Sequence, residues 1–92
     1  MAYECVIDGQ IYVFEAQYGE ELETSRIIVR CAAGGPEGLF LVQRDGALEP
    51  ADDLPGFGPN PVAVDGVWPL PPAQAIDDAR RMAERKGLDA ST

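Results

Sequence analysis

The fold of this chain is decided by residues 3–18, which read YECVIDGQIYVFEAQY. Two runs rich in aromatic and β-branched residues, Tyr3–Ile7 and Gln10–Tyr18, flank the pair Asp8-Gly9. Such runs favour strands, and Asp-Gly accepts the positive φ angles of a type I′ turn at low steric cost. The stretch therefore predicts a β-hairpin closed by a two-residue turn.

A two-residue turn also fixes the register of the hairpin, placing Cys5 opposite Tyr12 and Tyr3 opposite Phe14. We expect the aromatic face to lie on the core; it consists of Tyr3, Cys5, Tyr12, Phe14, Ala16 and Tyr18. The other face is half apolar and consists of Glu4, Val6, Ile11, Val13, Glu15 and Gln17. Its three apolar residues are predicted either to form an exposed patch or to contact a further layer.

Further strands follow the hairpin. Alternating residues predict strands at Arg26–Ala32 and Leu39–Arg44, with a short return at Ala47–Glu49 after the second Asp-Gly pair. Between the first two, residues 34–38 read GGPEG and predict a turn. Residues 50–72 then hold seven of the eight prolines and predict an irregular surface excursion. Within it, Val62–Val64 and Val67–Trp68 suggest a small hairpin.

One helix is predicted over Pro72–Lys86, because prolines suit a first helical turn and Gly87 suits a C-cap. Its apolar stripe, predicted to pack on the sheet, consists of Ile76, Ala79, Met82 and Ala83. Of the i,i+4 neighbours Asp77–Arg81 and Asp78–Met82, only the first can form an ion pair. Strands in hairpins followed by one helix indicate an α+β fold, an antiparallel sheet of four to five strands with a C-terminal helix on one face. We expect one domain over residues 1–88 and a frayed tail over residues 89–92.

Charge and composition limit the function. The 92 residues carry sixteen acids, seven bases and no histidine, for a net charge of −9. Such a charge disfavours direct binding to nucleic acid or to an anionic membrane, because both are polyanions. The lack of histidine excludes imidazole bases, nucleophile pairs that use histidine, and zinc sites that need it.

Cysteine content and hydropathy indicate a cytoplasmic protein. No leader-like segment and no apolar run long enough to span a membrane is apparent. Cys5 and Cys31 are then predicted to be free thiols that fill the core. The distance between them is left open by the sequence.

No catalytic motif is apparent, so the chain is predicted not to be an enzyme. Serine occurs only at Ser25 and Ser91, outside any nucleophile motif, and no phosphate-binding loop is present. Asp52-Asp53 lacks the ligand spacing of a calcium loop. No cofactor and no metal are expected, and a small metal-dependent or carboxylate enzyme is only the third hypothesis.

Three features are candidates for partner binding. The first is an acidic loop with Glu20, Glu21 and Glu23, and the second is an acidic group made of Glu49, Asp52 and Asp53. Both are explained either as a solvated surface that keeps the protein soluble or as carboxylates that compete for a basic site on another protein. The third is Phe57, in PGFGPNP, which either plugs the core or forms an exposed anchor.

The general profile is similar to that of small phage or mobile-element proteins that inhibit host defence systems, including anti-CRISPR proteins. The resemblance rests on size, acidity, the lack of catalytic motifs and the α+β layout. It implies a non-enzymatic inhibitor that blocks a basic, nucleic-acid-handling surface of a protein complex, as a nucleic-acid mimic does. The alternative is a structural or adaptor subunit that docks through Val6, Ile11, Val13 and the Phe57 loop.

Overall fold

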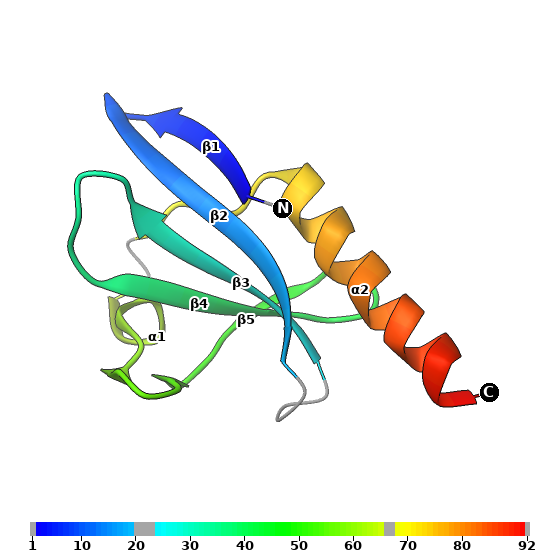
Figure 1. Cartoon of the computed structure of the whole chain (residues 1–92). Helices are drawn as coiled ribbons and strands as arrows, with labels where there is room; N and C mark the ends of the chain where they lie inside the picture. The colour runs from blue at the N-terminus through cyan, green and yellow to red at the C-terminus, as the bar shows by residue number, and fades with distance from the viewer. Residues whose placement is uncertain (1, 20–23, 66–67, 92) are drawn as a thin grey trace.

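The protein has an α+β fold, as the sequence predicts, with a five-stranded antiparallel sheet and a C-terminal helix on one face (Figure 1). The computed structural model describes residues 2–19, 24–65 and 68–91. The strands follow one another in the sheet in chain order. Their bounds are β1 Ala2–Ile7, β2 Gln10–Gly19, β3 Thr24–Cys31, β4 Glu37–Val42 and β5 Leu48–Pro50.

The first hairpin has the predicted turn and register. Asp8 and Gly9 have φ angles of 51° and 78°, so both central residues are left-handed, as a type I′ turn requires. Cys5 pairs with Tyr12 and Tyr3 pairs with Phe14. The aromatic face of the hairpin therefore lies on the core side, with Phe14 fully buried.

The main core lies between the sheet and α2 (Ala73–Ser91). Its buried residues are Phe14, Ala16, Ile27, Val29, Phe40, Val42, Val62, Ala75 and Ala79. Ala75 and Ala79 are fully buried on the helix, and Ile76 and Met82 are partly buried beside them. Small side chains at these two positions let the helix backbone approach the sheet closely, with the larger residues on the flanks.

Three details of the helix differ from the prediction. It begins at Ala73 and not at Pro72, and it continues through Gly87 to Ser91, so Gly87 does not end it. The ion pairs are Asp77–Arg80 at 4.0 Å and Asp78–Arg81 at 3.8 Å, so they have i,i+3 spacing and not the i,i+4 spacing of Asp77 and Arg81. The division into a domain of residues 1–88 and a tail of residues 89–92 stays a prediction.

The predicted turn at residues 34–38 is too long by two residues, because Glu37 and Gly38 already belong to β4. Position 38 of this strand requires glycine for a steric reason. A Cβ at Gly38 would overlap Cγ2 of Val62 and come within 3.0 Å of Cγ1 of Val29. Val62 thus fills the space that a side chain at position 38 would take.

The proline-rich excursion is more regular than predicted. It contains a two-stranded ribbon, β6 (Asp53–Leu54) with β7 (Gly58–Pro59), and the short helix α1 (Pro61–Asp65). The predicted hairpin arm at Val62–Val64 is wrong, because these residues are helical. Val67, in the other predicted arm, lies outside the described residues.

Both cysteines are free and half-buried. They lie on either side of Tyr12, because Cys5 pairs with Tyr12 across β1 and β2 and Cys31 pairs with it across β2 and β3. Two strand spacings separate their backbones by about 10 Å, beyond the reach of a disulfide. Tyr12 itself contacts Trp68 edge to face, with ring centroids 6.2 Å apart.

Candidate interaction surface on the β6–β7 ribbon

Phe57 is exposed at the tip of the β6–β7 ribbon. Its side chain is 82% exposed, so the hypothesis that it plugs the core is wrong. The backbone N–H of Phe57 donates to the carbonyl oxygen of Leu54 at 2.9 Å. Gly56 between them has a φ of 84°, and Pro55 precedes it, which is the residue pattern of a type II turn. The turn thus directs an aromatic ring into solvent.

The base of the ribbon is held on the face of the sheet opposite α2. Leu54 and Ala51 are buried there against Leu39 of β4, with Ile28 and Leu41 partly buried alongside. This second, smaller cluster is separate from the core under α2. Because the ribbon is packed at its base, Phe57 is presented from a fixed support.

Asn60 joins the ribbon to the sheet. Its side chain is fully buried, and its Oδ1 accepts from the backbone N–H of Leu39 at 3.1 Å and of Val62 at 3.2 Å. Its Nδ2 donates to the carbonyl oxygens of Leu39 at 2.8 Å and of Ala51 at 2.7 Å. All four hydrogen-bonding positions of the amide are therefore used, and the side chain replaces a strand along this part of β4.

Asn60 also begins α1. Its carbonyl oxygen accepts from the backbone N–H of Ala63 at 3.1 Å and of Val64 at 3.3 Å, and Pro61 follows as the first helical residue. Asparagine at the N-cap and proline at the next position are both favoured at helix starts. The sequence pair Asn60-Pro61 carried this signal, which the sequence analysis missed.

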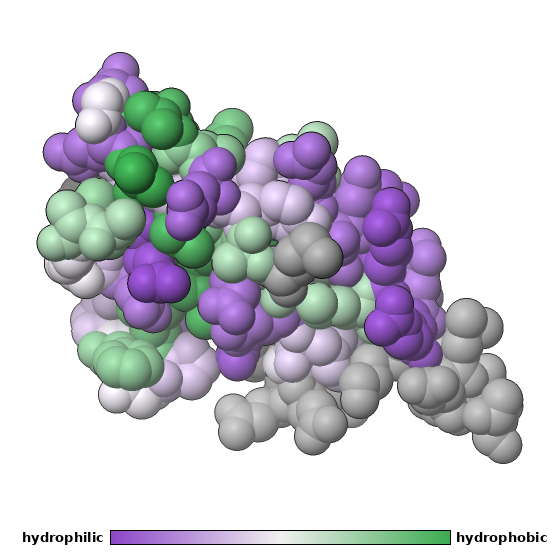
Figure 2. Space-filling model, turned by 45° about the horizontal axis from the view of Figure 1, so that its top comes forward, coloured by the Kyte–Doolittle hydropathy of each residue, from purple (hydrophilic) through white to green (hydrophobic). Residues whose placement is uncertain are grey.

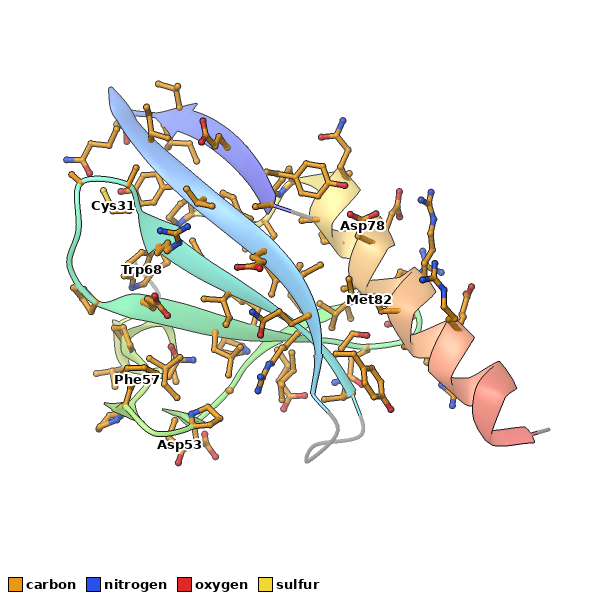
Figure 3. All side chains as sticks on the ribbon, in the orientation of Figure 1. Cys31, Asp53, Phe57, Trp68, Asp78 and Met82 are labelled. Carbon is orange, nitrogen blue, oxygen red and sulfur yellow. The ribbon has the colours of Figure 1, made fainter. Side chains whose placement is uncertain are left out.

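The acidic group at the start of the excursion lies on the same segment as Phe57. Glu49, Asp52 and Asp53 are all exposed, and Glu49 accepts from Nε2 of Gln43 at 3.0 Å. Asp53 opens β6 and pairs with Pro59 of β7, so it stands at the base of the ribbon that carries Phe57 (Figure 3). The other acidic group, Glu20, Glu21 and Glu23, lies outside the described residues.

The second predicted docking surface is only partly exposed. On the face of the sheet opposite α2, Val6 is 72% exposed and Ile11 is 43% exposed. Val13 is buried, so it does not belong to an exposed patch. Val6 and Ile11 pair directly across β1 and β2, and the surface they form is small.

The pKa of the Tyr3 hydroxyl is raised above its ordinary value of 10.0. This hydroxyl donates to Oδ2 of Asp78 at 2.5 Å. This hydrogen bond is the main cause that raises the pKa of Tyr3, and burial and the charge of Asp78 add to it. The Tyr3–Asp78 hydrogen bond joins β1 to α2 and involves no residue of the β6–β7 ribbon.

Two kinds of feature are absent from the described residues, a metal-binding cluster and a membrane-spanning helix. In those residues no cluster of three or more His, Cys, Asp or Glu side chains is placed to hold a metal ion. No helix found there combines the length and the apolar character needed to cross a membrane. Comparison of the chain with protein-family models, with curated proteins and with solved structures gave no match.

Proposed function

We propose that this protein is a non-enzymatic binding protein that inhibits a partner by covering a basic, nucleic-acid-handling surface of it. The observation that carries the proposal is the exposed Phe57 on a ribbon held by Asn60, beside exposed carboxylates. Sequence character adds to it, since the net charge of −9 attracts basic surfaces and repels nucleic acids and anionic membranes. Its place would be the cytoplasm, with no cofactor.

The ribbon supplies the two components that a small interface needs. An exposed phenylalanine gains about 1.5–3 kcal/mol when a partner buries it, and aromatic anchors dominate interface energetics. The carboxylates of Asp52 and Asp53 beside it act on arginine or lysine side chains of the partner, where they favour encounter and orientation. Because the support is packed, little ordering entropy is lost on binding.

The experiment begins with a photo-crosslinking amino acid at position 57, with the same substitution at Leu70 as the control. Leu70 is a fitting control because its side chain is 72% exposed and lies outside the ribbon. Proteins from cell extracts that crosslink from position 57 and not from position 70 are the partners. If position 57 gives no crosslink beyond those from position 70, the ribbon is not the binding surface.

The captured partner then serves to separate charge from apolar contact. Reversing Asp52 or Asp53 singly to lysine should slow association, with the largest loss at low salt, because steering acts on the encounter rate. Phe57→Ala should mainly raise the dissociation rate. Glu84→Lys, an exposed carboxylate on α2, is the matched control. Equal effects of Glu84→Lys and the ribbon reversals would contradict a local acidic site.

An adaptor subunit that docks through apolar contacts is the second candidate, favoured by the exposure of Val6 and Ile11. Apolar docking depends weakly on salt, whereas charge-driven binding weakens steeply with it. Binding that is unchanged by Asp52 and Asp53 reversal but lost in Ile11→Ala would support the adaptor and contradict the inhibitor hypothesis.

A further inference from the structure

β1 is the outer strand of the sheet, and no element lies along its outer side in the part of the chain that the structure describes (Figure 1). Because a two-residue turn closes the hairpin, Ile7, Cys5 and Tyr3 exchange backbone hydrogen bonds with β2. The backbone N–H and C=O groups of Glu4 and Val6 therefore point to the open side. Neither residue takes part in the loop and cap hydrogen bonds of the described backbone.

The opposite edge of the sheet, at β5, offers fewer unpaired backbone groups than the edge at β1. β5 has three residues and ends at Pro50, and beyond it the backbone of Leu39 in β4 is occupied by Asn60 and by the N–H of Ala51. Proteins protect free edges with prolines, charged side chains or bulges. β1 (AYECVI) has no proline and no bulge, because its pairing with β2 is continuous, and Glu4 is its one charged residue.

The side chains beside the open edge define what it suits. Glu4 and Val6 are exposed on the face opposite α2, and Ile11 lies next to Val6 across the strand pair. Figure 2 shows hydrophobic side chains gathered at its upper left, the side on which the β1–β2 turn lies in Figure 1. The two strands and the turn between them carry Glu4, Asp8 and Glu15 and no base, so the charge near this edge is negative.

We propose that β1 binds an extended segment of another protein, which adds a sixth strand to the sheet. The segment pairs its backbone with the outward groups of Glu4 and Val6, as in β-augmentation. It carries a lysine or arginine opposite Glu4 and, two residues away on the same face, an apolar side chain opposite Val6. This surface is separate from the β6–β7 ribbon, so the proposal goes beyond the function proposed above.

A second copy of this chain fits the edge less well. It would bring the same glutamate and no base, so Glu4 would lack a cation, and two chains of net charge −9 would repel. A six-residue edge also buries less than the roughly 1,200 Å² of a stable protein interface. Charge and area both favour a short basic segment.

The probe is a fluorescein-labelled peptide of about eight residues. Every second residue is threonine, and the positions between the threonines are lysine and valine alternately, so lysine and valine share one face. Fluorescence anisotropy measures its binding to the full chain. Two comparison peptides carry glutamate in place of lysine, or N-methyl groups on the backbone amides that would face β1. We expect the first peptide alone to bind with a Kd below about 1 mM.

Three variants locate the binding. Val6→Pro removes one outward N–H without removing a bond to β2, and proline is tolerated on the open side of an edge strand; it should abolish binding. Glu4→Lys should weaken binding about fivefold to tenfold. Glu84→Lys, with the same change in charge on α2, should alter it less than about twofold. Circular dichroism establishes that each variant is folded.

Each outcome decides the proposal. Binding that survives N-methylation of the peptide and Val6→Pro, or no binding at all at about 1 mM protein, overturns it. A dimer of the chain in sedimentation analysis that dissociates in Val6→Pro also overturns it, because a second copy then occupies the edge. The proposal is supported if binding is lost both with the N-methylated peptide and in Val6→Pro. Binding should also be weakened by Glu4→Lys and not by Glu84→Lys.

Discussion

The hydroxyl of Tyr3 on β1 donates a 2.5 Å hydrogen bond to Oδ2 of Asp78 on α2. The two residues are 75 positions apart, so this contact joins the outer strand of the sheet to the helix that covers one of its faces. Asp78 also forms an ion pair with Arg81. The carboxylate therefore links the strand and the next turn of its own helix.

This contact predicts a loss of stability in alkali. The hydrogen bond to Asp78 raises the pKa of Tyr3 above the ordinary 10.0. Below the pKa of Tyr3 in the unfolded chain, the phenol keeps its proton in both the folded and the unfolded state. The stabilisation of the fold by the Tyr3–Asp78 hydrogen bond is then fully present. As the pH rises through the folded pKa the contribution is lost, because the unfolded chain releases the proton more easily.

The measurement is the urea midpoint of the wild type and of Tyr3→Phe at about pH 8 and about pH 11. Tyr3→Phe should lower the midpoint at the lower pH and should make less difference at the higher one. An equal difference at both values would show that the hydroxyl does not act through its proton.

A second prediction concerns the contact between Gly38 and Val62. Gly38→Ala should destabilise the fold by about 1–3 kcal/mol, because the added methyl group overlaps Val62 and presses on Val29. Val62→Ala removes the overlapping group and should cost about 1–3 kcal/mol by itself through the lost burial. Urea unfolding of both single variants and of the double variant measures their coupling.

The double variant should be about as stable as Val62→Ala alone, because the alanine at position 38 then enters the space that is left. Losses that simply add would show that Gly38 and Val62 do not compete for the same volume. The measured coupling thus tests why a glycine stands within β4.

The sheet was predictable from sequence because its signals are local. Asp8-Gly9 fixes a turn whose geometry permits one register, and alternation then assigns each residue of the hairpin to a face. The buried helix positions were harder to predict. The spacing correctly placed Ala79 on the sheet but gave no sign that Ala75 is as fully buried as Ala79, since Ile76 is the larger apolar residue.

Non-local contacts account for most of what the sequence analysis missed. Position 38 within β4 requires glycine because Val62 fills the space beside it, and the pair Tyr3 and Asp78 has no signature in the sequence. Gly87 resembles a helix stop, yet the helix continues, because glycine lowers helix propensity without forbidding a helix. In the candidate site, the exposure of Glu49, Asp52 and Asp53 was predictable because charged side chains are rarely buried. The exposure of Phe57 was not predictable, because it depends on how the turn that carries it packs on the sheet.

A third prediction tests the close approach of α2 to the sheet. Ala79 is fully buried, whereas Ala73 on the same helix is exposed. Ala79→Leu should therefore cost about 1–3 kcal/mol by overpacking, and Ala73→Leu should change stability by less than about 0.5 kcal/mol. Chemical denaturation compares the two. Similar losses would indicate that α2 does not pack on the sheet through Ala79.

The last prediction concerns Asn60, which has four hydrogen bonds in a fully buried site. Asn60→Ala leaves the backbone groups of Leu39, Ala51 and Val62 without their partner, and should cost about 2–4 kcal/mol in urea unfolding. Gln43→Ala is the control, because Gln43 forms an exposed hydrogen bond to Glu49 and should cost less than about 0.5 kcal/mol.

Asn60→Asp separates the donating side of the amide from the accepting side. A carboxylate can still accept from the N–H groups of Leu39 and Val62, but its other oxygen would face the carbonyl oxygens of Leu39 and Ala51. Repulsion and burial raise the pKa of the new carboxyl in the folded state. Its protonated form restores a donor, so the loss of stability should be smallest at about pH 4 and should grow toward about pH 8. A loss that does not depend on pH would show that Nδ2 does not face the two carbonyl oxygens. Because the same amide supports the ribbon that presents Phe57, a destabilised Asn60 variant should also lose specific crosslinking from position 57 before the sheet unfolds.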